Sequence, residues 1–272
     1  MASSSDLAWE SLRFTVDGLH VDVSSIRCEA QTDPVLILHG FGSTKEDYLD
    51  IALVKALSGV SFILYDAPGS GQSTCQDLTK ISIPFLVTLA EEIIKHYGIK
   101  KFHLIGHSMG GLTALKLAQK HPDAVLSFVN IKGNLAPEDC FLSRQVLDYP
   151  SDNPEDFLRQ FIERTRRAPQ YGNGMYASAL QGKVQAAVAR PIFESMVHIS
   201  DNQDLLRLFE TLPCPRMFMF GEQYNTLSYL GRLLHAGVEL AEIPQAGHFM
   251  MYSNPVEMWR RIGDFLKATI PK

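Results

Sequence analysis

The sequence predicts an α/β fold, a mostly parallel sheet of eight strands with a helical cap inserted after the sixth strand. Two observations lead to this prediction. Short, continuous apolar runs alternate with helical patterns along the chain, as in sheets that helices cover on both faces. In addition, residues 101–118 pass from an apolar run through Gly-His-Ser-Met-Gly-Gly into an alanine- and leucine-rich helix, which is the strand–turn–helix context of a nucleophilic serine.

Composition and charge exclude several classes of protein. Of the 272 residues, 46% are hydrophobic and 20% charged, which is enough for a large core, and the net charge of −5 leaves no basic surface for nucleic acid. No apolar run approaches a membrane span, and residues 1–10 lack the segments of a secretion signal. Four scattered cysteines without metal-ligand spacing are expected to be reduced structural thiols. We therefore expect a cytoplasmic protein.

The strands and helices follow from local patterns. Asp17 and Gly18 separate two alternating runs, which predicts a β-hairpin at the start of the chain. Alternation of strands and helices after this hairpin implies right-handed crossovers and parallel pairing. The predicted strands are 12–16, 19–23, Val35–Leu38, 61–65, 101–105, Val125–Ile131, 216–220 and 238–243. The predicted helices of the sheet region are 45–57, 83–97, 112–118, 227–235 and 255–268.

Residues 135–206 interrupt the alternation. They contain no convincing strand but carry amphipathic helical patterns at 157–167, 174–180 and 186–198. We interpret this stretch as a helical cap over the active site. Residues 1–134 and 207–272 then form the core, and core and cap make a single structural unit.

The turn around Ser108 has the residue types that a reactive serine needs. Gly106 and Gly110 avoid the clashes that a Cβ would cause in a tight turn, so that Ser108 points out of it. Backbone N–H groups at the start of the next helix then lie beside its Oγ, where they can receive a developing oxyanion.

Four motifs follow one another in a recognisable order. They are His-Gly-Phe-Gly at 39–42, Asp-Ala-Pro-Gly-Ser-Gly-Gln-Ser at 66–73, Gly-His-Ser-Met-Gly-Gly at 106–111 and Ala-Gly-His-Phe at 246–249. With them the sequence resembles the α/β-hydrolase superfamily, and specifically its small, capped, lipase- and esterase-like members. The resemblance implies Ser108 as nucleophile and His248 as its general base. It also implies an oxyanion hole made by the backbone N–H groups of Phe41 and Met109.

The acid of the catalytic triad is missing from both of its usual positions. After the strand at 216–220 the expected aspartate position holds Tyr224, and after Val125–Ile131 the alternative position holds Lys132. Lys132 is either a solvated loop lysine or a side chain that reaches the pocket, where it would contact a substrate carboxylate or donate a proton.

Three explanations of the missing acid stay open. A nearby carboxylate takes over, an asparagine amide orients His248 as in Cys-His-Asn sites, or the triad is incomplete and Lys132 disfavours the imidazolium. The carboxylate candidates are Glu138, Asp139 and Glu222. The amide candidates are Asn130, Asn134 and Asn225.

The leading prediction is a serine hydrolase that cleaves a small-to-medium hydrophobic carboxylic ester, lactone or thioester through an acyl-enzyme on Ser108. The alternatives are a non-hydrolytic enzyme (a lyase, cyclase or cofactor-free oxygenase) and a receptor-like binder with a vestigial triad. The missing acid supports both alternatives. We expect a small-molecule substrate, no nucleic-acid partner, no cofactor and no metal, and the oligomeric state is left open.

Overall fold

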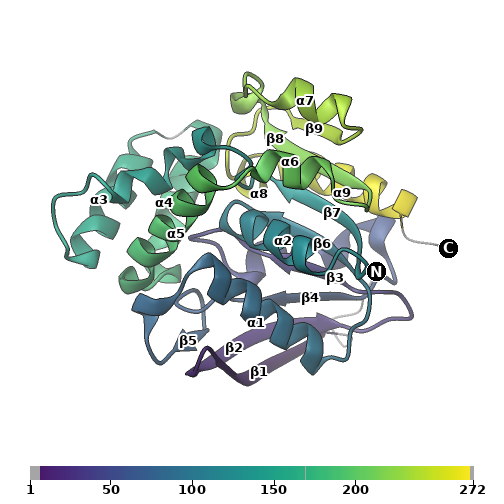
Figure 1. The fold of residues 1–272 in the computed structure, drawn as a ribbon, viewed down its shortest axis with the longest axis horizontal. Helices are drawn as coiled ribbons and strands as arrows, with labels where there is room; N and C mark the ends of the chain where they lie inside the picture. Colours follow the sequence, from purple (N-terminus) through teal and green to yellow (C-terminus); the bar gives the residue numbers. More distant parts are fainter. Residues whose placement is uncertain (1–6, 169, 270–272) are drawn as a thin grey trace.

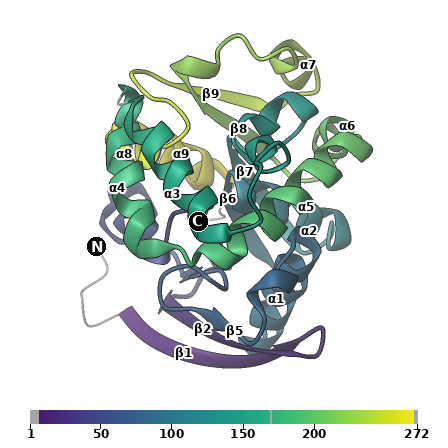
Figure 2. The ribbon, with the colours of Figure 1, turned by 90° about the vertical axis from the view of Figure 1, so that its left-hand side faces the viewer.

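The structure, a computed structural model, describes residues 7–168 and 170–269. Within these residues a nine-stranded sheet carries helices on both faces (Figure 1, Figure 2). Its main path has the order β1-β2-β4-β3-β6-β7-β8-β9, and β5 pairs with β2 beside this path. Most of residues 1–10, where we expect no secretion signal, lie outside the described ranges.

All eight predicted strands are present, and pairing is antiparallel among β1, β2, β4 and β5 and parallel from β4 through β3 to β9. Their bounds are β1 (Leu7–Val16), β2 (Leu19–Cys28), β3 (Val35–Leu38), β4 (Phe62–Tyr65), β6 (Phe102–His107), β7 (Val125–Ile131), β8 (Arg216–Gly221) and β9 (Glu239–Ile243). The hairpin strands β1 and β2 extend beyond the predicted runs to ten residues each. The ninth strand, β5 (Thr74–Cys75), was not predicted because two residues carry no periodicity.

The helices divide between the two faces of the sheet. In both views α1, α2 and α6 lie on one side and α9 on the other (Figure 1, Figure 2). Their bounds are α1 (Ile83–His96), α2 (Met109–Lys120), α6 (Leu205–Glu210), α7 (Leu230–His235), α8 (Met250–Ser253) and α9 (Pro255–Thr269). The helix predicted at 45–57 is wrong in type, because the chain forms 3₁₀ segments at Lys45–Leu53 and Lys55–Leu57. The extended backbone of Val54 separates them.

Between β7 and β8 the described chain is helical. The helices α3 (Pro154–Arg166), α4 (Asn173–Lys183) and α5 (Ala189–Asn202) gather at one end of the sheet, at the left of Figure 1. Val184, just after α4, forms a β-bridge with Ser70 in the turn after β4, which fastens this region to the sheet. We call residues 135–206 the cap, and this division of the chain remains a prediction. Across the described ranges, no helix combines the length and hydrophobicity needed to cross a bilayer.

The strand order brings the candidate site residues together. Parallel strands end at the same edge of a sheet, and β3, β6 and β7 are neighbours. Phe41 follows β3, Ser108 follows β6 and Lys132 follows β7 directly. The loop after β9 carries His248 to the same edge, so the sheet topology alone accounts for the position of the site.

Candidate active site

Ser108 occupies a strained backbone conformation between β6 and α2. Its φ of 51° and ψ of −116° are rare for any residue with a side chain. The turn is held in place by the Ser108 N–H, which donates to the Ile131 carbonyl at 3.0 Å. A Cβ on Gly106 would come within 2.5 Å of the Gly110 carbonyl, and one on Gly110 would collide with the Leu38 carbonyl of β3. Strain at one serine, maintained by close backbone packing, is typical of a functional turn.

Ser108 and His248 line one small cavity. Its volume is about 20 Å³, which is room for about one water molecule. Most of the other lining residues are apolar or aromatic, and they come from the cap, from the loop after β3 and from the loop after β9. They are Phe41, Asp139, Phe141, Leu142, Ser143, Phe161, Tyr176, Phe193, Met196 and Phe249. A larger hollow of about 790 Å³, along α3 and residues 181–187, includes neither Ser108 nor His248. Size alone therefore does not locate the site.

His248 is buried and neutral. Its backbone carbonyl accepts a 2.9 Å hydrogen bond from Nε2 of His107, which holds the loop after β9 against the turn at Ser108 (residues 106–111, called the elbow below). Burial lowers the pKa of His248 well below its ordinary value of 6.5, and His107 and Lys132 lower it further. The Nδ1 atom of the imidazole, to which a triad acid would bind, has no hydrogen-bond partner in the described part of the chain. This histidine therefore lacks the acceptor that normally stabilises its charged form.

Lys132 is buried beside this imidazole, so the possibility of a solvated loop lysine is wrong. It follows β7 with a φ of +46°, and its N–H donates to the Met219 carbonyl at 2.8 Å. Its side chain is 1% exposed and forms an ion pair with Asp139. The ammonium lies 4.8 Å from the ring centre of Tyr224 and 5.9 Å from that of Phe141. Both rings also contact the imidazole of His248, at 6.2 and 5.4 Å between ring centres.

Asp139 lines the cavity, but its carboxylate is already fully used. Oδ1 accepts from the Lys132 ammonium and, at 2.8 Å, from the Tyr229 hydroxyl. Oδ2 accepts from the N–H groups of Leu135 and Ala136 at 2.8 and 2.9 Å. Asp139 thus serves as the counter-ion of Lys132. The partner Tyr229 was missed at the sequence level, since it lies 90 residues away and no local pattern identifies it.

Four of the other acid and amide candidates have partners other than the imidazole, and the fifth is exposed. Glu138 is exposed and accepts from the Ser228 hydroxyl at 2.6 Å, whereas Glu222 accepts from the Gln245 N–H at 2.7 Å. The amide oxygen of Asn130 accepts from Gly133 N–H. Asn134 donates to Cys140 and Ser200, and Asn225 is exposed. The structure therefore brings Ser108, His248 and Lys132 together but places none of these candidates in hydrogen-bond contact with His248 Nδ1.

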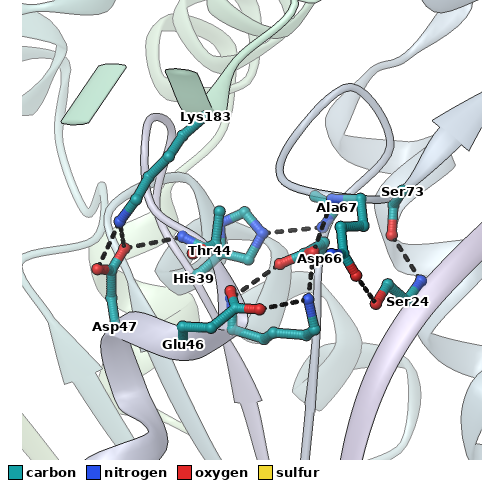
Figure 3. A network of polar contacts seen from close by, with 11 residues as sticks. Ser24, His39, Thr44, Glu46, Asp47, Asp66, Ala67, Ser73 and Lys183 are labelled. Carbon is teal, nitrogen blue, oxygen red and sulfur yellow. Dashed lines mark hydrogen bonds and ion pairs between the residues drawn. The ribbon is translucent and has the colours of Figure 1, made fainter. Parts of the chain in front are cut away.

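The loop after β3 is fixed by His39. Its Nε2 accepts from the Ala67 N–H at 2.8 Å (Figure 3), and its Nδ1 donates to the Gly40 carbonyl at 2.8 Å, so the ring is held in one neutral tautomer. A Cβ on Gly40 would come within 2.5 Å of the His107 ring. The loop therefore packs directly on the turn at Ser108, where Phe41 lines the same cavity as Ser108 and Met109 begins α2.

The comparisons with known proteins agree with this architecture. The family model of the alpha/beta hydrolase fold matches residues 33–183, more than half of the chain. The chain belongs to this family. It is 28% identical over 264 residues to monoacylglycerol lipase abhd6-A of Xenopus laevis, covering 86% of this chain and 75% of that protein. It is 24% identical over 274 residues to the human monoacylglycerol lipase ABHD6, with the same coverage. A thermophilic esterase from Thermogutta terrifontis superimposes with a TM-score of 0.73 at 19% identity, covering 96% of this chain and 99% of that one.

Because three buried histidines have lowered pKa values, we expect acid to destabilise the fold. Burial lowers the pKa values of His39 and His248, and it lowers that of His107 to about 4. Because the unfolded chain takes up protons near pH 6.5 and the folded chain does not, the free energy of unfolding falls as the pH drops below 6.5. His107 alone contributes a loss of about 2 kcal/mol at pH 5. Urea unfolding at pH 7.5, 6.5 and 5.5 measures this; a stability that stays level or rises over this interval would contradict it.

Proposed function

We propose that this chain is a serine hydrolase of carboxylic esters. The observation that carries the proposal is the strained Ser108, which shares a single apolar cavity with the buried, neutral imidazole of His248. A serine hydroxyl becomes a useful nucleophile when a neutral imidazole takes its proton, and strain that the fold maintains around one serine is a feature of catalytic turns. The curated relatives, which are named as lipases, support the same reaction.

The reaction proceeds through an acyl-enzyme. Ser108 Oγ attacks the ester carbonyl while His248 Nε2 takes its proton, and the proton then passes to the departing alcohol oxygen. The carbonyl oxygen becomes an anion, which the N–H groups of Phe41 and Met109 receive. The N-terminal end of the twelve-residue helix α2 adds its dipole to this stabilisation. Water, deprotonated by His248, attacks the acyl group, and the proton returns to Ser108 as the acid leaves.

The lining favours a hydrophobic acyl group. Five phenylalanine rings surround the cavity, from Phe41, Phe141, Phe161, Phe193 and Phe249. A cavity of about 20 Å³ holds no acyl chain, so side chains or helices of its lining must shift when a substrate binds. We propose a small-to-medium hydrophobic ester, lactone or thioester, and the relatives' names make a short-chain monoacylglycerol a suitable first substrate. The expected cytoplasmic location remains a prediction from the sequence.

A second candidate function rests on Lys132. A buried ammonium beside an imidazole without a carboxylate partner disfavours the imidazolium that ester hydrolysis forms. Replacing the triad acid by an amide lowers turnover by about 10⁴-fold in a serine protease, so the chain would be a slow hydrolase. The scaffold would then serve non-hydrolytic chemistry, such as a lyase, a cyclase or a cofactor-free oxygenase, or serve ligand binding with a vestigial triad.

A fluorophosphonate probe tests whether Ser108 is activated. We expect the parent chain to gain the mass of one phosphonyl group and Ser108→Ala to gain none, as measured by intact mass spectrometry. Ser143→Ala is the matched control, because Ser143 lines the same cavity without the strained turn, and it should label like the parent. A parent chain that stays unlabelled at high probe concentration would argue for the second candidate.

Exchanging the charge at position 132 tests the missing acid. The double variant Lys132→Glu/Asp139→Asn provides one carboxylate near His248 Nδ1 without leaving a second buried one. We expect its kcat on p-nitrophenyl butyrate to rise at least tenfold, a part of the about 10⁴-fold that a triad acid is worth. Lys132→Met/Asp139→Asn is the control, since it removes both charges and adds no acceptor. Equal rates in the two double variants, with both folded by circular dichroism, would show that a carboxylate here has no role.

A further inference from the structure

One cap residue contacts the backbone of the loop after β3. The hydroxyl of Tyr176, on α4, donates to the Phe41 carbonyl at 2.8 Å. Tyr176 is only 1% exposed, and the two residues are 135 positions apart in the chain. The next residue, Gly42, has a φ of +82°, and a Cβ there would lie 2.6 Å from the Tyr176 ring. The tyrosine thus lies directly against the peptide group between Phe41 and Gly42.

The same tyrosine also contacts the loop after β9, which carries His248. Its ring stacks on that of Phe249 with 3.5 Å between ring centres and an interplanar angle of 18°. Phe249 follows His248 directly and contacts its imidazole at 4.8 Å between ring centres. One side chain of the cap therefore packs between the two loops that the proposed reaction needs.

The C-terminal end of α4 makes a second connection to the loop after β3. Lys183 donates to both carboxylate oxygens of Asp47, at 2.6 and 2.7 Å (Figure 3). Asp47 in turn accepts from the Thr44 N–H at 2.9 Å, three residues after Phe41. Lys183 also lies 3.3 Å from the hydroxyl of Tyr252 on α8, the helix that follows His248. Both ends of α4 therefore join the loop after β3 to the segment that carries His248.

We propose that Tyr176 is a positioning residue that orients Phe41 for oxyanion stabilisation. This inference rests on the proposed function, since it assigns a role to the N–H of Phe41. The N–H of Phe41 belongs to the preceding peptide group, whose Gly40 carbonyl accepts from His39 Nδ1 at 2.8 Å and from the Ser43 N–H at 3.1 Å. The following peptide group lies next to Gly42, which tolerates many backbone conformations, so a contact at the Phe41 carbonyl is needed to hold the other side of the residue. The buried Tyr176 hydroxyl supplies that contact and fixes the backbone of Phe41.

A structural consequence links the cap to catalysis. If α4 shifts when a substrate enters, the Phe41 carbonyl loses its donor, and the loop keeps only its contacts through His39 and Gly40. Both peptide groups of Phe41 are therefore held only while α4 packs on the loop, which links the docking of the cap to the geometry of the oxyanion hole. A donor that is already oriented when charge develops is worth far more than one that must reorient.

The test is Tyr176→Phe, which removes the hydroxyl but keeps the ring that stacks on Phe249. We expect kcat on p-nitrophenyl butyrate to fall about tenfold or more while KM changes less than twofold, because the lost interaction acts in the transition state. The affinity for an alkyl boronic acid, which forms a tetrahedral adduct on serine, should fall by a similar factor. Tyr149→Phe is the matched control, because that cap tyrosine packs on Phe157 and is not part of the cavity lining.

Other outcomes separate this inference from the proposed function. A parent chain that hydrolyses the ester, together with a Tyr176→Phe variant of equal kcat, would overturn the positioning role alone. A change in KM without a change in kcat would overturn it too, since it would indicate a substrate contact. If the parent chain has neither activity nor fluorophosphonate labelling, the proposed function fails and this inference with it. Should Tyr176→Phe not fold, Lys183→Met is the second variant, because it releases the C-terminal end of α4 from Asp47 and so loosens the helix that carries Tyr176. We expect a smaller fall in kcat with KM unchanged; an unchanged kcat would contradict the role of α4.

Discussion

The close backbone packing around Ser108 is the constraint on which the site depends. At Gly106, Gly110 and Gly111 a Cβ would meet atoms of the elbow itself, of β3 or of the turn after β7 at 3.0 Å or less. Gly133 is equally enclosed, between Asn130 and Gly111. Because the ends of three neighbouring strands pack closely, with glycines at the contacts, the residues that follow them share one small volume. The geometry of the candidate site is in this sense a property of backbone packing.

The electrostatics of the site differ from those of a complete triad. In a complete triad a carboxylate compensates the imidazolium as it forms, whereas here the charged group that acts on the pKa of His248 is the ammonium of Lys132, which lowers it. Asp139 compensates the lysine, with Tyr229 and two backbone N–H groups as further donors. Removing one member of such a buried pair costs about 3–5 kcal/mol, so the two charges stay paired. The ammonium still lowers the pKa of His248, after burial and His107, although Asp139 compensates its charge. Without a carboxylate partner, protonation of the imidazole of His248 is less favourable, and this slows the reaction step that forms the imidazolium.

Sequence patterns predicted most of the fold. Val35–Leu38 and Val125–Ile131 have the predicted bounds, because continuous apolar runs mark buried parallel strands well. The strand–turn–helix pattern also located Ser108 at a strained turn. Strand β5 and the 3₁₀ segments at 45–57 were not predictable, since two-residue pairing and tight turns leave no periodic signal. The burial of Lys132 and the contact from Tyr176 to Phe41 depend on residues far apart in the chain, which only the packed cap brings together.

The central claim is that His248 stays neutral beside a buried lysine. The most direct test is a pH titration of the parent chain with ¹⁵N-labelled histidine, in which ring nitrogen shifts report the charge and tautomer of each imidazole. His248, assigned by comparison with His248→Gln, should remain neutral at pH 6, below the ordinary pKa of about 6.5. Burial lowers its pKa well below that value, so His248 should titrate at a lower pH than an exposed histidine of the same chain. A His248 that titrates at or above pH 6.5 would show that a compensating carboxylate reaches the imidazole and would contradict the account.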